Sequence, residues 1–100
     1  MSAYILGFVK SDGSDSVGEY IRRLPALHEK YGAELICYDN KPTALEEQDD
    51  SDVVVLLKFA DRESARSYWN SPEYQAARKF RLGHRTVKAV LIESQGQLGG

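Results

Sequence analysis

One histidine, His28, has a side chain suited to acid–base chemistry. It shares an apolar stripe with Leu24 and Tyr31, at the spacing of residues on one face of a helix. Histidine titrates near neutral pH, so His28 could act as a general base in a cavity. The alternative is a half-buried structural histidine that donates a hydrogen bond to a backbone carbonyl. The sequence favours that structural role, because a base must also face a cavity.

A group of aromatic residues with one arginine is a second candidate site. It consists of Tyr68, Trp69, Tyr74 and Arg78. The rings would form the walls of a pocket, and a guanidinium binds a carboxylate through two parallel hydrogen bonds. Such a pocket would suit an aromatic or carboxylated small molecule. Aromatic residues at helical spacing belong more often to a core or a dimer interface, so both interpretations stay open.

The sequence indicates neither a metal site nor a nucleotide site. Its two histidines lie far apart, and the carboxylates crowded into residues 46–52 form a solvated charge run rather than a calcium loop. Residues 13–18 follow a predicted strand, as a phosphate loop would. Glu19 and Tyr20, however, stand where that loop requires lysine followed by serine or threonine. No cofactor and no metal are therefore expected.

Four strands and two helical regions must position these candidates. Apolar runs and alternating patterns predict the strands, at residues 3–10, 33–38, 53–60 and 86–94. The run at 53–60 is the most hydrophobic, which indicates a strand buried on both faces near the centre of the sheet.

The helical regions lie between the first two strands and between the last two. The first covers residues 17–31, and Gly32 follows as its natural C′ residue. Pro25 inside it predicts a kink or a break into two short helices. The second region starts after Asp61, which can cap it. It is divided at Ser71, because Ser-Pro-Glu is the order favoured at a helix N-terminus.

This β-α-β-β-α-β order predicts an α+β, ferredoxin-like domain with an antiparallel four-stranded sheet and helices on one face. The other face of the sheet stays open. Apolar residues on both sides of 53–59 and 87–92 predict that a second subunit covers it in a homodimer. Residues 1–95 are expected to form the single domain, and residues 96–100 a flexible tail.

Composition and charge narrow the class of protein. The chain has 100 residues, 42% hydrophobic and 28% charged, as expected for one folded domain. Its net charge of -2 gives no general attraction to nucleic acid. No apolar run approaches the roughly 20 residues that span a membrane, and the N-terminus lacks the pattern of a signal peptide, so we expect a cytoplasmic protein. Basic residues are expected to form a local surface at Arg78, Lys79, Arg81, Arg85 and Lys88.

Several motifs together carry a family resemblance. They are Tyr20 in an amphipathic helix, Pro25-Ala26-Leu27, Lys30-Tyr31-Gly32, Glu63-Ser64-Ala65-Arg66 and Ser71-Pro72-Glu73-Tyr74-Gln75. With them the chain resembles, from Tyr4 to Glu93, the bacterial family called domain of unknown function 1330. That family is similar in fold to the dimeric α/β barrels, which include cofactor-free monooxygenases and muconolactone-type isomerases. The resemblance implies a dimeric α/β barrel and no settled activity.

Three functions are consistent with these observations. The first is a homodimer that binds a small molecule between helices and sheet without catalysis, since no nucleophile or metal set is readable. The second is a cofactor-free oxygenase or isomerase for a small aromatic or ketoacid-like substrate, with His28 as base and Tyr68, Tyr74 and Arg78 orienting the substrate. The third is a purely structural dimerisation module, whose packed interior would bind no ligand.

Overall fold

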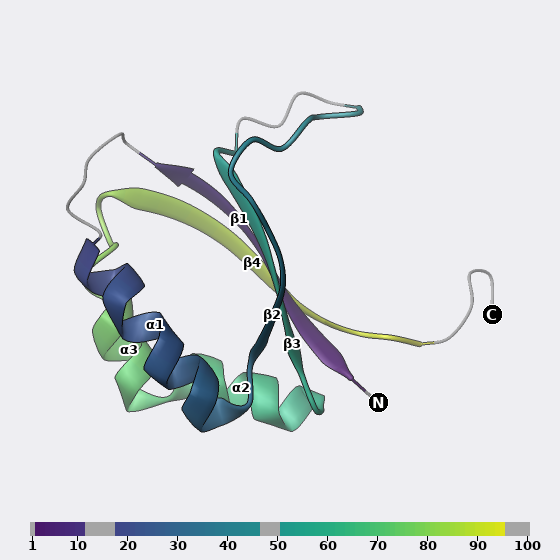
Figure 1. Cartoon of the computed structure of the whole chain (residues 1–100), viewed down its shortest axis with the longest axis vertical. Coiled ribbons are helices and arrows are strands. Elements are labelled where there is room, and N and C mark those ends of the chain that lie inside the picture. Colours follow the sequence, from purple (N-terminus) through teal and green to yellow (C-terminus); the bar gives the residue numbers. More distant parts are fainter. Residues whose placement is uncertain (1, 12–17, 47–50, 96–100) are drawn as a thin grey trace.

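The computed structural model describes residues 2–11, 18–46 and 51–95 of the chain. In chain order the elements are β1 (Ala3–Ser11), α1 (Gly18–Tyr31), β2 (Glu34–Asp39), β3 (Val53–Phe59), α2 (Arg62–Asn70), α3 (Pro72–Arg78) and β4 (Arg85–Glu93). The strands form one antiparallel sheet in the order β2-β3-β1-β4, and the helices lie together on one side of it (Figure 1). The predicted ferredoxin-like α+β fold is confirmed. The tail predicted at 96–100 lies outside the described residues.

The two inner strands, β1 and β3, form the centre of the sheet, as the hydrophobicity of 53–60 predicts. Ile5 of β1 is paired with Leu57 of β3 on one side and with Leu91 of β4 on the other. Because successive side chains of a strand point to opposite faces, this register places alternate residues of three strands under the helices. The outer strand β2 carries a bulge between Leu35 and Cys37, and its residues are exposed.

Helix α1 is a single helix, so of the two alternatives predicted for Pro25, a kink or a break into two short helices, the break is wrong. Pro25 lies inside it. The missing N–H of Pro25 deprives only the Ile21 carbonyl of its helical partner, and both residues are exposed, so water can satisfy that carbonyl. The predicted C′ residue is confirmed, since Gly32 has a φ of 69° and the Ala33 N–H donates to the His28 carbonyl at 2.8 Å.

The division between α2 and α3 occurs at Ser71, as the capping pattern predicts. The Ser71 hydroxyl donates to the Tyr68 carbonyl at 2.8 Å, and its oxygen accepts from the Tyr74 N–H at 3.0 Å. Asp61 caps α2 in the same way, accepting from the Ser64 N–H at 2.7 Å. Ser71 is buried, so its two bonds determine the angle at which Tyr68 and Tyr74 approach the sheet.

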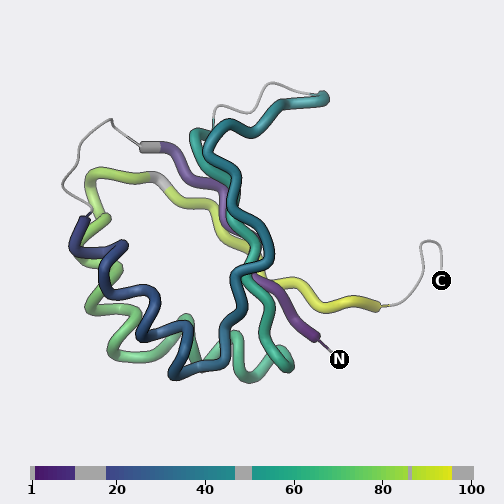
Figure 2. Tube along the Cα trace, in the orientation of Figure 1, coloured from purple at the N-terminus to yellow at the C-terminus, as the bar shows by residue number. Residues whose placement is uncertain are grey.

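The chain continues to wind in turns after α3, and this contradicts one prediction. Arg81 was expected on a basic surface, but only 4% of it is exposed. The Arg81 N–H donates to the Arg78 carbonyl at 3.0 Å, which continues the helical winding beyond α3. Arg81 therefore stays on the face of Tyr74 and Ala77, which are buried against the sheet. In the Cα trace α1 and α3 run side by side over the sheet (Figure 2).

Candidate functional site

A cavity of about 90 Å³ lies between the helices and the sheet. Its strand wall is apolar and includes Ile5, Val55, Leu57 and Ala89. Its aromatic and polar residues are Tyr20, His28, Tyr68, Trp69, Tyr74, Arg81 and Arg85. An apolar cavity with a few converging polar groups is the usual form of a small-molecule site.

Four of the five site residues predicted from sequence line this cavity. His28, Tyr68, Trp69 and Tyr74 come from α1, α2 and α3 and meet over the sheet. Arg78 is half-buried but is not one of the lining residues. The guanidinium groups at the cavity belong instead to Arg81 and Arg85, which the prediction of the site missed. The available signal for Arg81 is its position seven residues after Tyr74, on the same face of a helical winding.

His28 presents a ring nitrogen to the interior. Its Nε2 is buried and makes no hydrogen bond within the described part of the chain. The ring centroid lies 5.8 Å from that of Tyr68. Burial lowers the pKa of His28 from its usual value of 6.5, because water no longer solvates the charged form. The imidazole is therefore neutral at pH 7, and Nε2 can exchange a hydrogen bond or a proton with a bound molecule.

A short chain of polar contacts joins Tyr20, Tyr74 and Arg81. The two tyrosine hydroxyls lie 3.1 Å apart, and the Arg81 Nη2 donates to the Tyr74 hydroxyl at 3.3 Å. The Arg81 guanidinium also lies 5.5 Å from the centroid of the Tyr20 ring. Burial raises the pKa of Tyr20, so that phenol stays neutral. Tyr20, one of the partners of Arg81 in this chain of contacts, is thus uncharged.

Tyr68 is both a core residue and part of the cavity wall. It is 2% exposed, and its ring centroid lies 5.3 Å from that of Phe59 and 5.0 Å from that of Tyr74. Burial also raises the pKa of Tyr68. Trp69 is less buried, and its ring lies 4.8 Å from that of Tyr74. The core and pocket interpretations of this aromatic group are therefore compatible.

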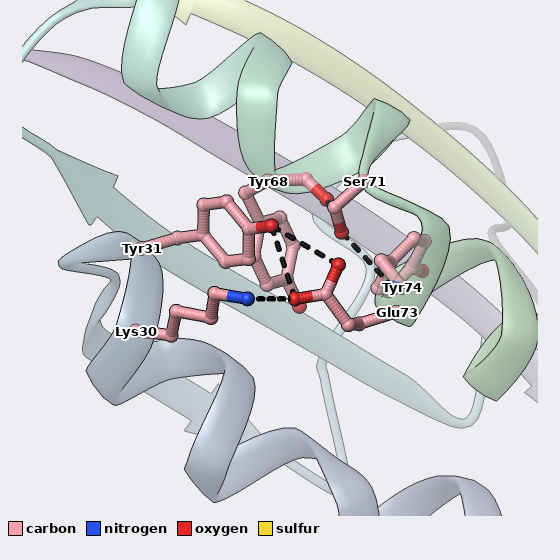
Figure 3. Close-up of polar contacts among 6 residues, drawn as sticks. All are labelled: Lys30, Tyr31, Tyr68, Ser71, Glu73 and Tyr74. Atoms are coloured by element: carbon pink, nitrogen blue, oxygen red, sulfur yellow. Dashed lines mark hydrogen bonds and ion pairs between the residues drawn. The ribbon is translucent and has the colours of Figure 1, made fainter.

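Glu73 joins α1 to α3 at the rim of this aromatic group (Figure 3). Lys30 forms an ion pair with Glu73, and the Tyr31 hydroxyl lies 3.3 Å from both Glu73 carboxylate oxygens. The hydrogen bond from Lys30 lowers the pKa of Glu73, so its carboxylate stays ionised. The contact spans 43 residues of sequence and brings the two helices together beside Tyr68.

The described residues contain no group of three His, Cys, Asp or Glu side chains that could hold a metal ion. In this same part of the chain, no helix is long and apolar enough to cross a membrane.

The family described as Domain of unknown function (DUF1330) matches residues 2–95. The chain belongs to the DUF1330 family. The resemblance inferred from Ser71-Pro72-Glu73-Tyr74-Gln75 and the other motifs is thereby confirmed. The sequence matches no curated protein.

Solved structures share the ferredoxin-like fold of this DUF1330 chain at low sequence identity. A protein of unknown function from Rhodopseudomonas palustris is 14% identical, with a TM-score of 0.76, covering 96% of this chain and 84% of that one. A dimeric ferredoxin-like protein of unknown function from Jannaschia sp. CCS1 is 19% identical, with a TM-score of 0.70, covering 94% and 100%. SnoaB, a cofactor-independent oxygenase from Streptomyces nogalater, is 13% identical, with a TM-score of 0.57, covering 99% and 98%.

Proposed function

We propose that this DUF1330 protein binds a small molecule in the cavity between its helices and its sheet. The observation that carries the proposal is the His28 Nε2, which is buried at the cavity without a hydrogen-bond partner among the described residues. Buried polar atoms are nearly always hydrogen-bonded, because an unmade bond leaves the desolvation cost uncompensated. A ligand that bonds to His28 and fills the apolar space would remove that cost.

The position of Trp69 suggests how the cavity accommodates a ligand. A second hollow of about 180 Å³ adjoins it between α2 and β4, and both hollows are lined by Ile5, Trp69 and Ala89. Movement of the Trp69 side chain would join them. Their combined volume would approach the roughly 300 Å³ at which typical small-molecule pockets begin.

A thermal-shift screen of a metabolite library tests the binding proposal. A ligand that binds only the folded protein raises the melting temperature by mass action. In Ala89→Leu three additional carbon atoms enter the space shared by both hollows, so stabilisation by each hit should be lost. Ala76→Leu places the same side chain on the exposed surface of α3, and stabilisation by each hit should be unchanged in this variant. A protein that no compound stabilises would instead be a structural dimerisation module.

A second candidate function is catalysis without a cofactor, by an oxygenase or isomerase acting on a small aromatic or ketoacid-like substrate. The neutral imidazole of His28, whose ring lines the cavity, favours it. General bases contribute about 10²-fold to 10⁴-fold to a rate. Incubating each screening hit with the protein and oxygen, and analysing products by mass spectrometry, tests this function. A turnover that His28→Gln leaves intact would exclude His28 as the base.

We further propose that the protein is a homodimer formed through the open face of its sheet. Leu6 is paired with Leu56 on one side and Val90 on the other, so an apolar row crosses this face. Val90 and Ile92 of β4 are exposed there, at 37% and 43%. Dimeric relatives such as the Jannaschia protein support the proposal.

A further inference from the structure

Two arginines, Arg81 and Arg85, line the cavity. Only 4% of Arg81 is exposed, and its Nε is buried without a hydrogen-bond partner in the part of the chain that the structure describes. Among the same described residues, the Nε atoms of Arg85 and of Arg78, which does not line the cavity, are also buried without a partner. Neither Arg81 nor Arg85 forms an ion pair with a carboxylate of residues 2–11, 18–46 or 51–95. The polar side-chain partners of Arg81 there are the hydroxyl groups of Tyr74, which lies 3.3 Å from its Nη2, and of Tyr20.

This arrangement is energetically unfavourable unless an anion joins it. A buried charge loses its hydration, and an ion pair with further hydrogen bonds is the usual compensation. The phenol oxygens of Tyr74 and Tyr20 supply few acceptors, whereas each guanidinium group carries five N–H donors. Two positive groups at one cavity also repel each other. A negative ligand group would satisfy the donors and remove the repulsion.

The backbone brings the two arginines to the same place. The Arg85 N–H donates to the Arg81 carbonyl at 3.0 Å, so the residues lie one turn apart. Gly83 has a φ of 84° between them, which directs the chain from this turn into β4. Arg85 then shares a face of β4 with Val87 and Ala89, both of which line the cavity. Arg85 thus lies at one end of the apolar strand wall.

We infer that Arg81 and Arg85 form a carboxylate-binding end of this cavity, and that its ligand is a small monocarboxylate with a compact apolar group. The inference rests on the proposed small-molecule function. A carboxylate suits planar guanidinium groups because it accepts two parallel hydrogen bonds. The strand wall of Ile5, Leu57 and Ala89 would contact the apolar group. The volume of about 90 Å³ limits that group, since a cavity of about 150 Å³ holds benzene.

Matched acids and amides test the ligand class. Butyrate is compared with butyramide, and propionate with propionamide, by titration calorimetry and by amide chemical shifts in NMR spectra of the full chain. Each amide keeps the shape of its acid but lacks the charge. We expect at least one acid to bind on the order of 10-fold to 100-fold more tightly than its amide, as charge-assisted hydrogen bonds imply.

Arginine variants test the residues. Arg81→Met and Arg85→Met should each weaken binding of the acid by about 10-fold or more. Arg78→Met is the matched control, because Arg78 does not line the cavity. This variant should bind the acid as tightly as the original protein does. Without ligand, Arg81→Met should be at least as stable as the original protein, since an apolar side chain of similar length removes an unpaired buried charge. A structural arginine would give a less stable variant.

Three results would overturn the inference. They are equal affinity for acid and amide, acid binding that survives both Arg81→Met and Arg85→Met, and binding of inorganic phosphate as tightly as either acid. The proposed function would survive any of them if a neutral compound still bound and Ala89→Leu abolished that binding. If no compound of the library bound, both the proposed small-molecule function and the inference of a carboxylate ligand would fail.

Discussion

At the scale of single residues, His28 makes the stability of the protein depend on pH. Burial lowers its pKa below 6.5 in the folded state, whereas the unfolded chain keeps the usual value. Above pH 6.5 the residue is neutral in both states. As the pH falls through 6.5 towards the folded pKa, the unfolded state binds the proton first and stability is lost.

We therefore expect the free energy of unfolding to decrease as the pH is lowered from 7.5 to about 5.5. His28→Gln should flatten the curve in this range, because glutamine has no proton to bind. Urea denaturation at several pH values measures both curves. At more acid pH the free energy of unfolding should still fall in both the original protein and His28→Gln, since the pKa values of Glu73 and Asp61 are also lowered in the folded state. Parallel curves above pH 5 would contradict the assignment to His28.

At the same scale, local sequence determines some of the cavity residues and not others. His28, Tyr68, Trp69 and Tyr74 could be predicted as cavity residues because apolar and aromatic residues at helical spacing must face the sheet. Arg81 could not be. An arginine after a short helix is normally exposed, and its burial depends on turns that continue the winding beyond Arg78.

At the scale of elements, Ser71 controls how the aromatic residues are presented. Its hydroxyl bonds to the end of α2 and the start of α3, and it is buried. Ser71→Ala would leave the Tyr68 carbonyl and the Tyr74 N–H without these partners. We expect a loss of about 1–2 kcal/mol in the free energy of unfolding, as for other helix caps.

Chemical denaturation of Ser71→Ala measures that loss, with Ser67→Ala as the control. Ser67 is an exposed residue of α2, so its replacement should change stability by less than about 0.5 kcal/mol. Equal stability of the two variants would show that the cap contributes nothing. Any ligand of the cavity should also bind Ser71→Ala more weakly, because Tyr68 and Tyr74 would lose their common support.

At the scale of the whole molecule, the proposed dimer forms through the open face of the sheet. We expect the protein to sediment as a dimer and Val90→Lys to sediment as a monomer, because a charge in an apolar interface loses its hydration without a partner. Leu82→Lys is the control, since Leu82 is exposed on the turn after α3 rather than on the sheet. A dimer in both variants would place the interface elsewhere.

The sequence by itself determined the order of the elements, the ferredoxin-like fold and the caps at Asp61, Ser71 and Gly32. These follow from hydrophobic periodicity and from the backbone preferences of single residues, which act over a few neighbours. Only the tertiary structure decided that α1 stays whole at Pro25, and that Arg81 rather than Arg78 faces the cavity. Both outcomes depend on what surrounds a residue after packing, namely the solvent exposure of Ile21 and Pro25 and the apolar sheet beneath Arg81.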